Sequence, residues 1–393
     1  MCRGTSNNII THDDFNSGFF EASLKIGGNR DNFVASPLSV LVLLSALLTS
    51  KGASGETARE ICEGIIGKKA KRSCDNLDYP EIEKLLDRIR TGVERSRRGG
   101  EPQVLSISNA VFMQEGYRFY PGFHTNFAKL RGDRIEQTDF NTSKAVEAIN
   151  RWVRSSTDGL IEKMYNSPHE LSRDTLMVLL NAITFKDNWA KTFLKDKTSD
   201  GDFFLRNGQR IRVPMMRQEA LMTYVKQKKY TVVAKPFKDE RFKFVIFLPK
   251  HRFDLKEIED DLEDGDFNWH SLHSYRNEEQ VELILPKFNI KHEINLKPLL
   301  HLLGIRRLFT RGAAELTGIS PDSNLYASDA KQVAVMEVDE NGVKAAAVSS
   351  VSIMPMSMPP PAIPFKVDQP FYCAIYDTYL GMPLFIARVV DPR

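Results

Sequence analysis

Residues 337–375 read "EVDENGVKAAAVSSVSIMPMSMPPPAIPFKVDQPFYCAI", and this stretch decides the fold. Within it, residues 352–365 ("SIMPMSMPPPAIPF") carry no charge and no glycine. Proline removes a backbone donor and clashes with the preceding helical turn, so these residues form neither a buried helix nor a central strand. Strand-like patterning resumes directly afterwards. The stretch therefore predicts an extended, apolar connection between two strands, rather than a disordered tail.

The residues before this connection are small and suit a strand. In an extended chain Val343, Ala345 and Ala347 point to one face, and Lys344 and Ala346 point to the other. Burying an unpaired lysine is costly, so Val343 must face inward if this segment joins a sheet. A slip of one residue would invert the two faces. The segment is therefore suited to insertion as a strand in one register.

Proline also indicates which bond of the connection a protease can cut. Met354 and Met358 are each followed by proline, and endoproteases rarely cut before proline. Met356 is followed by Ser357, which makes Met356–Ser357 the one favourable bond after a methionine. The flanking prolines favour the extended polyproline geometry that protease clefts accept. Residues 345–365 contain no Lys or Arg, which disfavours a trypsin-like protease.

Composition places the chain among globular proteins with a large core. It has 393 residues, of which 42% are hydrophobic and 27% charged. The formal net charge of +3 does not suggest a nucleic-acid-binding protein. No apolar run reaches the roughly 20 residues of a membrane span. The polar residues 1–15 show no secretory signal, so we expect cytoplasmic localisation or unconventional export to the extracellular space.

No enzyme or metal motif is found. The GxSxG, GxxxxGK[ST], HExxH and GxGxxG patterns are all missing. His270 and His273 lack the neighbouring Cys, Asp or Glu ligands of a metal site, so we interpret them as surface or core residues. The "RGD" at 131–133 is interpreted as a helix end whose charges face water.

The cysteines do not form a disulfide-rich framework. Cys2, Cys62, Cys74 and Cys373 are widely spaced, and no CxxC pattern occurs. Cys62 and Cys74 could pair, although the sequence does not require it. Cys373 lies in an apolar run and is predicted to be a buried free thiol.

Periodicity predicts helices early in the chain and strands late, without regular alternation. This order favours an α+β fold over a doubly wound sheet. Helices are expected within residues 12–26, 36–67 (two helices) and 145–164, and strands within 106–113, 176–185, 242–249, 281–290 and 331–339.

Several of these segments together resemble the serpin family over essentially the whole chain. The residues that match, in order, are 32–61, 149–164, 176–193, "LPKFNI" (285–290), "LTGIS" (316–320) and "FKVDQPFYCAI" (365–375). The resemblance implies one domain, residues 1–393, with three β-sheets, eight or nine helices and an exposed reactive-centre loop at about 340–364.

The resemblance also implies a function, which is inhibition of a serine protease rather than catalysis. In the family a protease attacks the loop and forms an acyl-enzyme, and the cleaved loop then inserts as a strand into the main sheet. The family's loop length, counted from Glu340, places the reactive residue at Met356, and "PMSMPP" (355–360) resembles the bait of antitrypsin-like members. We therefore expect a monomeric inhibitor of an elastase- or chymotrypsin-like protease, needing no cofactor.

The loop hinge departs from the family pattern at two positions. By the resemblance, the hinge comprises Glu340, Gly342, Val343, Lys344, Ala345, Ala346 and Ala347. Inhibitory members usually carry a small hydroxylated residue in place of Val343 and an acidic residue in place of Lys344. These departures motivate an alternative function, a non-inhibitory serpin acting as a carrier, chaperone or storage protein.

The resemblance further assigns a sheet-opening region, and the sequence offers two candidate surface sites. The region comprises Ser36, Ser39, Asn181, Trp189 and Gln332, with Gln332 in place of the usual histidine, so any pH sensitivity tied to that histidine would be lost. Because some members bind heparin-like polyanions near their fourth helix, a basic site is proposed at Lys68, Lys69, Lys71, Arg72, Arg88, Arg95, Arg97 and Arg98. The alternative is a solvated helix flanked by a loop, whose charges face water. Asn141 begins an "NTS" sequon, which could be glycosylated in the secretory route, although a turn or capping role is the alternative.

Overall fold

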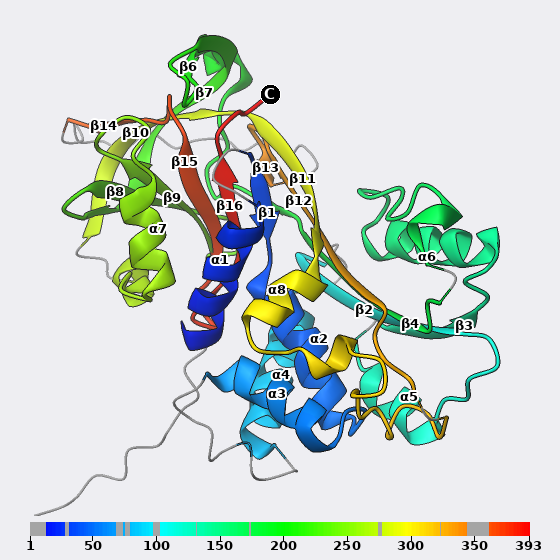
Figure 1. Ribbon diagram of the computed structural model, residues 1–393. Helices are drawn as coiled ribbons and strands as arrows, with labels where there is room; N and C mark the ends of the chain where they lie inside the picture. Colours follow the sequence, from blue (N-terminus) through cyan, green and yellow to red (C-terminus); the bar gives the residue numbers. More distant parts are fainter. Residues whose placement is uncertain are drawn as a thin grey trace, which may run out of the picture.

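The computed structural model describes residues 13–27, 31–67, 74, 79–96, 103–130, 132–172, 174–273, 277–322, 324–343 and 361–393. These residues form eight α-helices and two hydrogen-bonded sheets (Figure 1). The helices are α1 (Asp13–Gly27), α2 (Pro37–Thr49), α3 (Gly55–Ile66), α4 (Pro80–Arg95), α5 (Pro121–Phe127), α6 (Ser143–Ser156), α7 (Lys256–Glu263) and α8 (Leu296–Leu302). Short 3₁₀ turns lie at Pro168–Glu170 (η2), Lys195–Lys197 (η3), Trp269–His273 (η4) and Arg307–Phe309 (η6).

Helix α2 lies in the centre of the molecule. It is apolar on all sides, and each of its residues from Pro37 to Leu48 is buried, as expected for a core helix. Ser36 caps its first turn by accepting a hydrogen bond from the Ser39 N–H, and Pro37 occupies the first helical position, where no N–H is needed. The cap places the side chains of Ser36 and Ser39 beside the main sheet.

The seven-stranded sheet is the main sheet of the fold. Its strands are β2 (Leu105–Gln114), β3 (Arg134–Thr138), β4 (Met177–Phe185), β5 (Asp187–Asn188), β11 (Phe288–Asn295), β12 (Asp329–Val338) and β13 (Gly342–Val343). They are ordered β3-β2-β4-β12-β13-β5, with β11 also paired to β12. Helix α6 covers one face of this sheet (Figure 1), and its Ile149, Trp152 and Val153 bury an amphipathic stripe against it.

The nine-stranded sheet is divided by the long strand β7 (Arg210–Lys226). Residues 223–226 of β7 pair with β8, whereas residues 210–223 pair with β6 and β10. The two parts of this sheet and the seven-stranded sheet therefore make three groups of strands. The other strands are β1 (Phe33–Ala35), β6 (Ser199–Phe204), β8 (Tyr230–Pro236), β9 (Phe242–Pro249), β10 (Glu278–Pro286), β14 (Ile363–Lys366), β15 (Phe371–Asp377) and β16 (Met382–Val389).

The single strand expected at 281–290 is divided between the two sheets. β10 ends at Pro286, and β11 begins at Phe288. Pro286 has no N–H to donate to a ladder, and the chain passes from one sheet to the other at Lys287. This crossing brings Lys287 close to the hinge of the predicted loop.

The structure shows which of the described cysteines are paired, and it confirms the predicted buried free thiol. Cys62 on α3 is bonded to Cys74, with 5.8 Å between their Cα atoms. Cys373 is free and fully buried, and burial raises the pKa of its thiol. Among the residues that the structure describes, no helix is long and apolar enough to cross a membrane.

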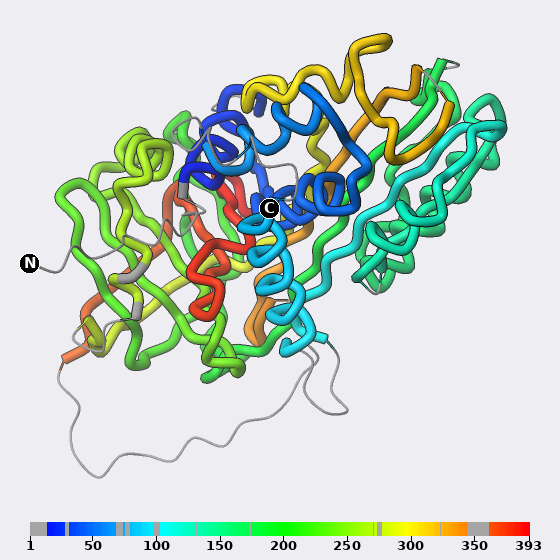
Figure 2. Tube along the Cα trace, turned by 90° about the horizontal axis from the view of Figure 1, so that it is seen from below, coloured from blue at the N-terminus to red at the C-terminus, as the bar shows by residue number. Residues whose placement is uncertain are grey.

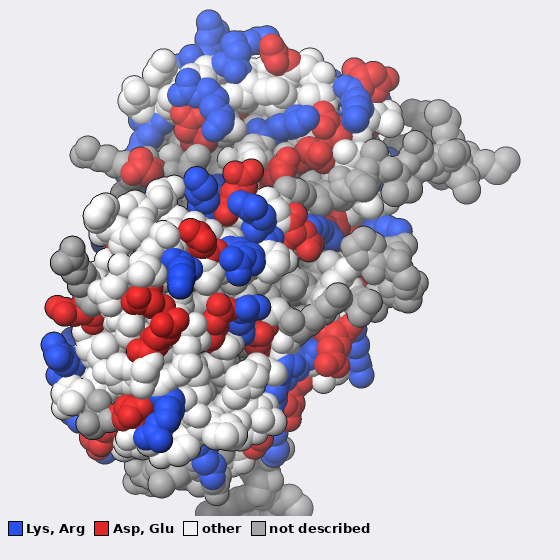
Figure 3. All heavy atoms as spheres, turned by 90° about the vertical axis from the view of Figure 1, so that its right-hand side faces the viewer, with Lys and Arg blue, Asp and Glu red and all other residues white. Residues whose placement is uncertain are grey.

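Charges of both signs are mixed on the face that bears α6. Figure 3 shows Lys and Arg side chains interspersed with Asp and Glu over this face, without a block of one sign.

Candidate functional site: the sheet seam and the hinge

The seam between β4 and β12 divides the main sheet. The two strands are parallel, and their ladder runs from Asp329 opposite Val178 to Ala334 opposite Ile183. Beyond this ladder the short strand β13 lies between β12 and β5, antiparallel to both. At this end the sheet therefore already holds one extra strand, whereas further along β4 and β12 are paired directly.

A buried polar cluster joins the seam to α2. Gln332 on β12 donates from Nε2 to Ser36 O at 2.8 Å, to Ser39 Oγ at 2.9 Å and to Asn181 Oδ1 on β4 at 3.0 Å. Its Oε1 accepts from the Ser36 N–H at 3.0 Å. All four side chains are fully buried. Separating β4 from β12 must therefore break the hydrogen bond between Gln332 and Asn181.

Two residues that the sequence analysis did not assign extend this cluster. Asn181 Nδ2 donates to Asn109 Oδ1 on β2 at 2.9 Å, and the N–H and Nδ2 of Asn109 both donate to Asp133 Oδ1. Asp133 Oδ2 accepts from the N–H groups of Lys129 and Leu130. Burial raises the pKa of Asp133 to about 6, against the lowering effect of these hydrogen bonds.

The interpretation of "RGD" at 131–133 as charges facing water is therefore wrong for Asp133. The carboxylate of Asp133 turns inward because four N–H donors converge on it. Arg131 lies outside the described residues.

The hinge is anchored at Gly342 and Val343. Val343 is opposite Val338 on one side and Asp187 on the other, and it is buried in the main core. Gly342 is opposite Asn188, and a Cβ added to it would lie only 2.0 Å from Asp187 O. Only glycine allows the two backbones to approach this closely.

The loop at 189–193 holds three successive carbonyl groups of the hinge. The indole Nε1 of Trp189 donates to Asp339 O at 2.9 Å, and its N–H donates to Asn341 O at 2.8 Å. The Phe193 N–H donates to Glu340 O at 2.9 Å. Trp189 is itself buried and stacked on Phe237, with 4.7 Å between ring centroids. We call residues 189–193 the hinge clamp.

Glu340 is held by its side chain as well. Its carboxylate accepts hydrogen bonds from Lys287 Nζ at 2.8 Å and from Thr198 Oγ1 at 3.0 Å. Burial alone would raise the pKa of Glu340, but the bonds from Lys287 and Thr198 outweigh it, and the pKa is lowered.

The structure thus separates the five predicted sheet-opening residues into two groups. Ser36, Ser39, Asn181 and Gln332 form the polar cluster, whereas Trp189 lies with the hinge. The remaining hinge and reactive-bond residues lie outside the described residues: Lys344, Ala345, Ala346, Ala347, Met356 and Ser357.

The basic site is described only in part. Arg88 and Arg95 on α4 both lie over the ring of Tyr379, at 5.5 Å and 5.4 Å from its centroid, and both are exposed. Figure 2 shows α4 (cyan) beside the turn between β15 and β16 (red), which carries Tyr379. The other predicted residues lie outside the described residues: Lys68, Lys69, Lys71, Arg72, Arg97 and Arg98.

Asn141 is exposed in the turn before α6, where its N–H and Nδ2 both donate to Asp139 Oδ1. The backbones of His270 and His273 lie in η4, and their side chains are not described. In the described part of the chain, no group of three or more His, Cys, Asp or Glu residues could hold a metal ion.

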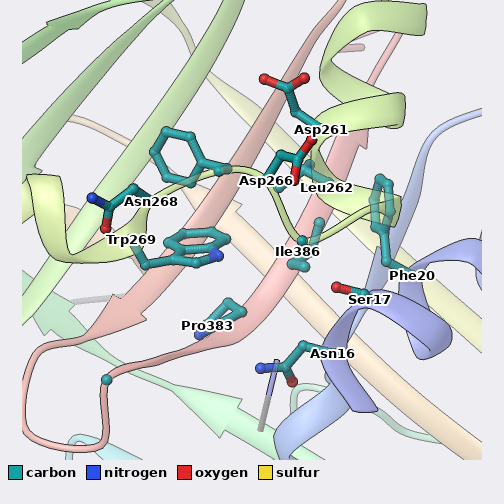
Figure 4. A pocket seen from close by; sticks show the side chains of 13 residues that line it. Asn16, Ser17, Phe20, Asp261, Leu262, Asp266, Asn268, Trp269, Pro383 and Ile386 are labelled. Atoms are coloured by element: carbon teal, nitrogen blue, oxygen red, sulfur yellow. The ribbon is translucent and has the colours of Figure 1, made fainter. Parts of the chain in front are cut away.

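A pocket also lies away from the seam, between α1, the end of α7 with the segment that follows it, and β16. Figure 4 shows Asn16, Ser17 and Phe20 from α1 opposite Asp261 and Trp269. Asn16 is buried, and its Oδ1 has no hydrogen-bond partner among the residues that the structure describes. No sequence motif marks this pocket, because its residues come from three segments that are distant along the chain.

The sequence model of the family Serpin (serine protease inhibitor) matches residues 13–392. The chain therefore belongs to the serpin family, which is a family of protease inhibitors rather than enzymes, and the resemblance predicted from the sequence is confirmed.

Individual relatives cover nearly the whole chain. Iripin-2 from Ixodes ricinus is 31% identical over 366 residues, which span 92% of this chain and 88% of Iripin-2. Serpin B11 from Homo sapiens is 31% identical, over 92% of this chain and 94% of its own length. The solved serpin from the trematode Schistosoma haematobium superposes with a TM-score of 0.84 at 31% identity, covering 97% of this chain and 99% of that one. The predicted α+β serpin fold is confirmed.

Proposed function

We propose that this chain inhibits a serine protease by insertion of its cleaved loop into the main sheet. The protease attacks the carbonyl of Met356 and forms an acyl-enzyme, with Ser357 at the start of the released segment. Residues 344 onward then extend β13 between β12 and β4. The target is an elastase- or chymotrypsin-like protease, because methionine suits an apolar specificity pocket.

The observation that carries this proposal is the register of Val343. Val343 stands between Val338 on β12 and Asp187 on β5. Gln332 lies six positions before Val338, and Asn181 lies six positions before Asp187. Gln332 and Asn181 face each other across the seam. Both sides of the seam therefore have the register that one continued antiparallel strand requires, and this strand would bring Ser349 between Gln332 and Asn181.

The same register accommodates the unusual Lys344. A continued strand would place Lys344 opposite Glu337 on β12, on the face turned away from Val343. Opposite charges across neighbouring strands stabilise a sheet. Lys344 therefore agrees with insertion, which favours inhibition over the alternative carrier, chaperone or storage role.

Insertion would be driven by backbone pairing and burial. About a dozen new ladder hydrogen bonds at about 1 kcal/mol each would contribute on the order of 10 kcal/mol. The uncleaved state is then held by a kinetic barrier rather than by equilibrium stability. The ladder from Asp329 to Ala334 and the polar cluster around Gln332 are two parts of that barrier.

Incubation with pancreatic elastase or chymotrypsin tests the proposal, with the products separated on a denaturing gel. Inhibition predicts a stable band at the summed mass of protease and inhibitor, less the released C-terminal peptide. Rapid cleavage of the loop without such a band would favour the non-inhibitory alternative.

We also propose that the exposed face of α4 binds a heparin-like polyanion. Arg88 and Arg95 are seven positions apart, two helical turns, and lie on one face over Tyr379. Arg241 also lies over this ring, at 5.0 Å, but it is paired with the buried Asp377. The two exposed guanidinium groups are thus in position to contact adjacent anionic groups.

A further inference from the structure

Lys235 is a fully buried lysine on β8, only 1% exposed. Its Nζ donates to Lys191 O at 2.8 Å and to Gln218 Oε1. It also lies 5.3 Å from the centroid of the Trp189 ring and 4.8 Å from that of Phe193. These contacts place the amine directly beneath the hinge clamp.

Lys235 and Gln218 together support the middle of the clamp. Gln218 Nε2 donates to the carbonyl groups of Lys191 and Thr192. Both carbonyl groups lie between Trp189 and Phe193, whose N–H groups bind the hinge. The amine of Lys235 therefore holds the hinge clamp in place, and the hinge clamp holds residues 339–341.

Two acceptor oxygens and two aromatic rings face the amine of Lys235, but no carboxylate of the described residues compensates its charge. Among the described residues, Lys191 is the one charged side chain with an electrostatic effect on the amine of Lys235. Both side chains are positive when protonated, so Lys191 repels the charge of Lys235. On the neighbouring strands the registers turn Lys243 and Glu219 to the opposite faces of β9 and β7. The carboxylate of Glu340 is bound by Lys287 and Thr198 instead.

Burial, reinforced by Lys191, lowers the pKa of Lys235 to about 7. Both effects disfavour the ammonium form. When the clamp opens and water reaches the amine, its pKa returns towards the ordinary lysine value of about 10.4.

We propose that Lys235 is a positioning residue that aligns the hinge clamp with the hinge carbonyl groups, and that proton uptake by Lys235 favours release of the hinge. The direction of the pH effect follows from the linkage between proton binding by Lys235 and opening of the clamp. Because the open clamp binds the proton more tightly than the closed clamp, opening becomes easier as the pH falls from about 10 to about 7. Below about pH 7 both forms are protonated, and the effect levels off.

The consequence for inhibition rests on the proposed function. If the loop inserts as described, residues 339–341 must leave the clamp or rearrange within it. A clamp that opens more readily near neutral pH would then lower one part of the barrier to insertion.

Hydrogen–deuterium exchange of the Trp189 and Phe193 amides, corrected for the intrinsic effect of pH, tests the proposal at pH 7 and pH 9. These two amides donate to Asn341 O and Glu340 O, so their protection measures the opening of the clamp. In the wild type we expect protection to rise with pH, by up to about tenfold per unit.

Two variants at position 235 separate charge from shape. Lys235→Met removes the titrating amine, so the rise in protection between pH 7 and pH 9 should disappear. Lys235→Arg stays charged at both pH values, so its protection should be independent of pH and lower than that of the wild type at pH 9. Lys243→Met, on the neighbouring strand, is the matched control and should keep the wild-type rise.

The proposal is overturned if Lys235→Met keeps the wild-type pH dependence. It is overturned equally if the wild type shows no pH dependence, a result that needs no variant to fold. Exchange is measured on the free protein without protease. Failure of the inhibition experiment would therefore leave this result standing, and the two proposals fail independently.

Discussion

The carboxylate of Glu340 lies 2.8 Å from Lys287 Nζ, and this ion pair joins the hinge to the point where the chain crosses from β10 to β11. Glu340 is buried, whereas more than a third of the Lys287 side chain is exposed. Water therefore screens the pair in part, and its contribution is smaller than that of a fully buried ion pair.

Replacing Glu340 with Gln should lower the free energy of unfolding by about 1–2 kcal/mol at pH 7. Because the folded-state pKa of Glu340 is lowered, its stabilisation is complete above the ordinary glutamate pKa and is lost as the pH falls through the lower folded value. The difference between wild type and variant should therefore shrink below about pH 4. Denaturant unfolding at several pH values measures it.

Glu293→Gln provides the control for this prediction. Glu293 is paired with Lys331 but is exposed, so its replacement should change the stability by less than about 1 kcal/mol. A Glu340→Gln effect no larger than this, or one that does not change with pH, would contradict the assigned role of the ion pair.

Gly342→Ala should displace β13 from between β12 and β5. The added Cβ would lie 2.0 Å from Asp187 O, which belongs to a strand backbone and cannot move aside cheaply. We expect the amide of Val343 to exchange at least about tenfold faster than in the wild type. Gly122→Ala is the control, since a Cβ there meets no atom within 4 Å from other parts of the described chain. Equal exchange in both variants would show that the close approach does not hold the hinge.

Cleavage by pancreatic elastase or chymotrypsin should release a C-terminal peptide that begins at Ser357. The reason is that prolines follow the other two methionines of the loop, leaving Met356–Ser357 as the one bond after a loop methionine that no proline follows. N-terminal sequencing of the released peptide checks this. If the released peptide began mainly at another residue, the reactive bond would have to be assigned to a different position.

Val343→Arg should convert the inhibitor into a substrate. Val343 is 1% exposed in the main core, and a guanidinium group there would be buried without a partner. The number of inhibitor molecules consumed per protease inactivated should rise well above one. Lys344→Ala is the matched control, because residue 344 would face the other side of the sheet. An unchanged stoichiometry for Val343→Arg would argue against insertion in this register.

Replacing Arg88 and Arg95 together with Ala should lower the salt concentration at which the protein elutes from a heparin column. Binding to a polyanion releases condensed counterions, so each lost contact reduces the dependence on salt. The control is the pair Arg210 and Arg212, which are exposed but face Asp202. The proposed α4 site would be ruled out if both double variants eluted at the same salt concentration as the wild type. It would also be ruled out if the wild type were not retained on the column.

Much of the fold could be read from local patterns. Apolar residues at helical spacing predicted α1 and α6, and β-branched runs predicted β2, β4, β9 and β12. The expected strand at 281–290 was divided, because the pattern of apolar residues continues through Pro286 and does not show that the chain changes sheets there. Periodicity reports which side of an element is buried, but it does not report which element covers it.

Only part of the candidate site could be predicted from local patterns and the family resemblance. Ser36, Asn181 and Gln332 were found because the family resemblance carries them. Asp133 and Lys235 belong to no motif, and a single charged residue in a strand or turn usually faces water. Their burial depends on neighbours more than 20 positions away, such as Asn109 for Asp133 and Lys191 for Lys235.

The sequence by itself determined the family and the α+β class, because these depend on residue order and local periodicity. It also predicts, from the chemistry of proline, which bond is most open to proteolysis. Only the tertiary structure decided that Val343 stands in register with both sides of the seam, and that Lys235 supports the clamp which holds residues 339–341. Strand register and the burial of a charge depend on backbone pairing and desolvation between distant segments. No stretch of the chain contains these interactions on its own.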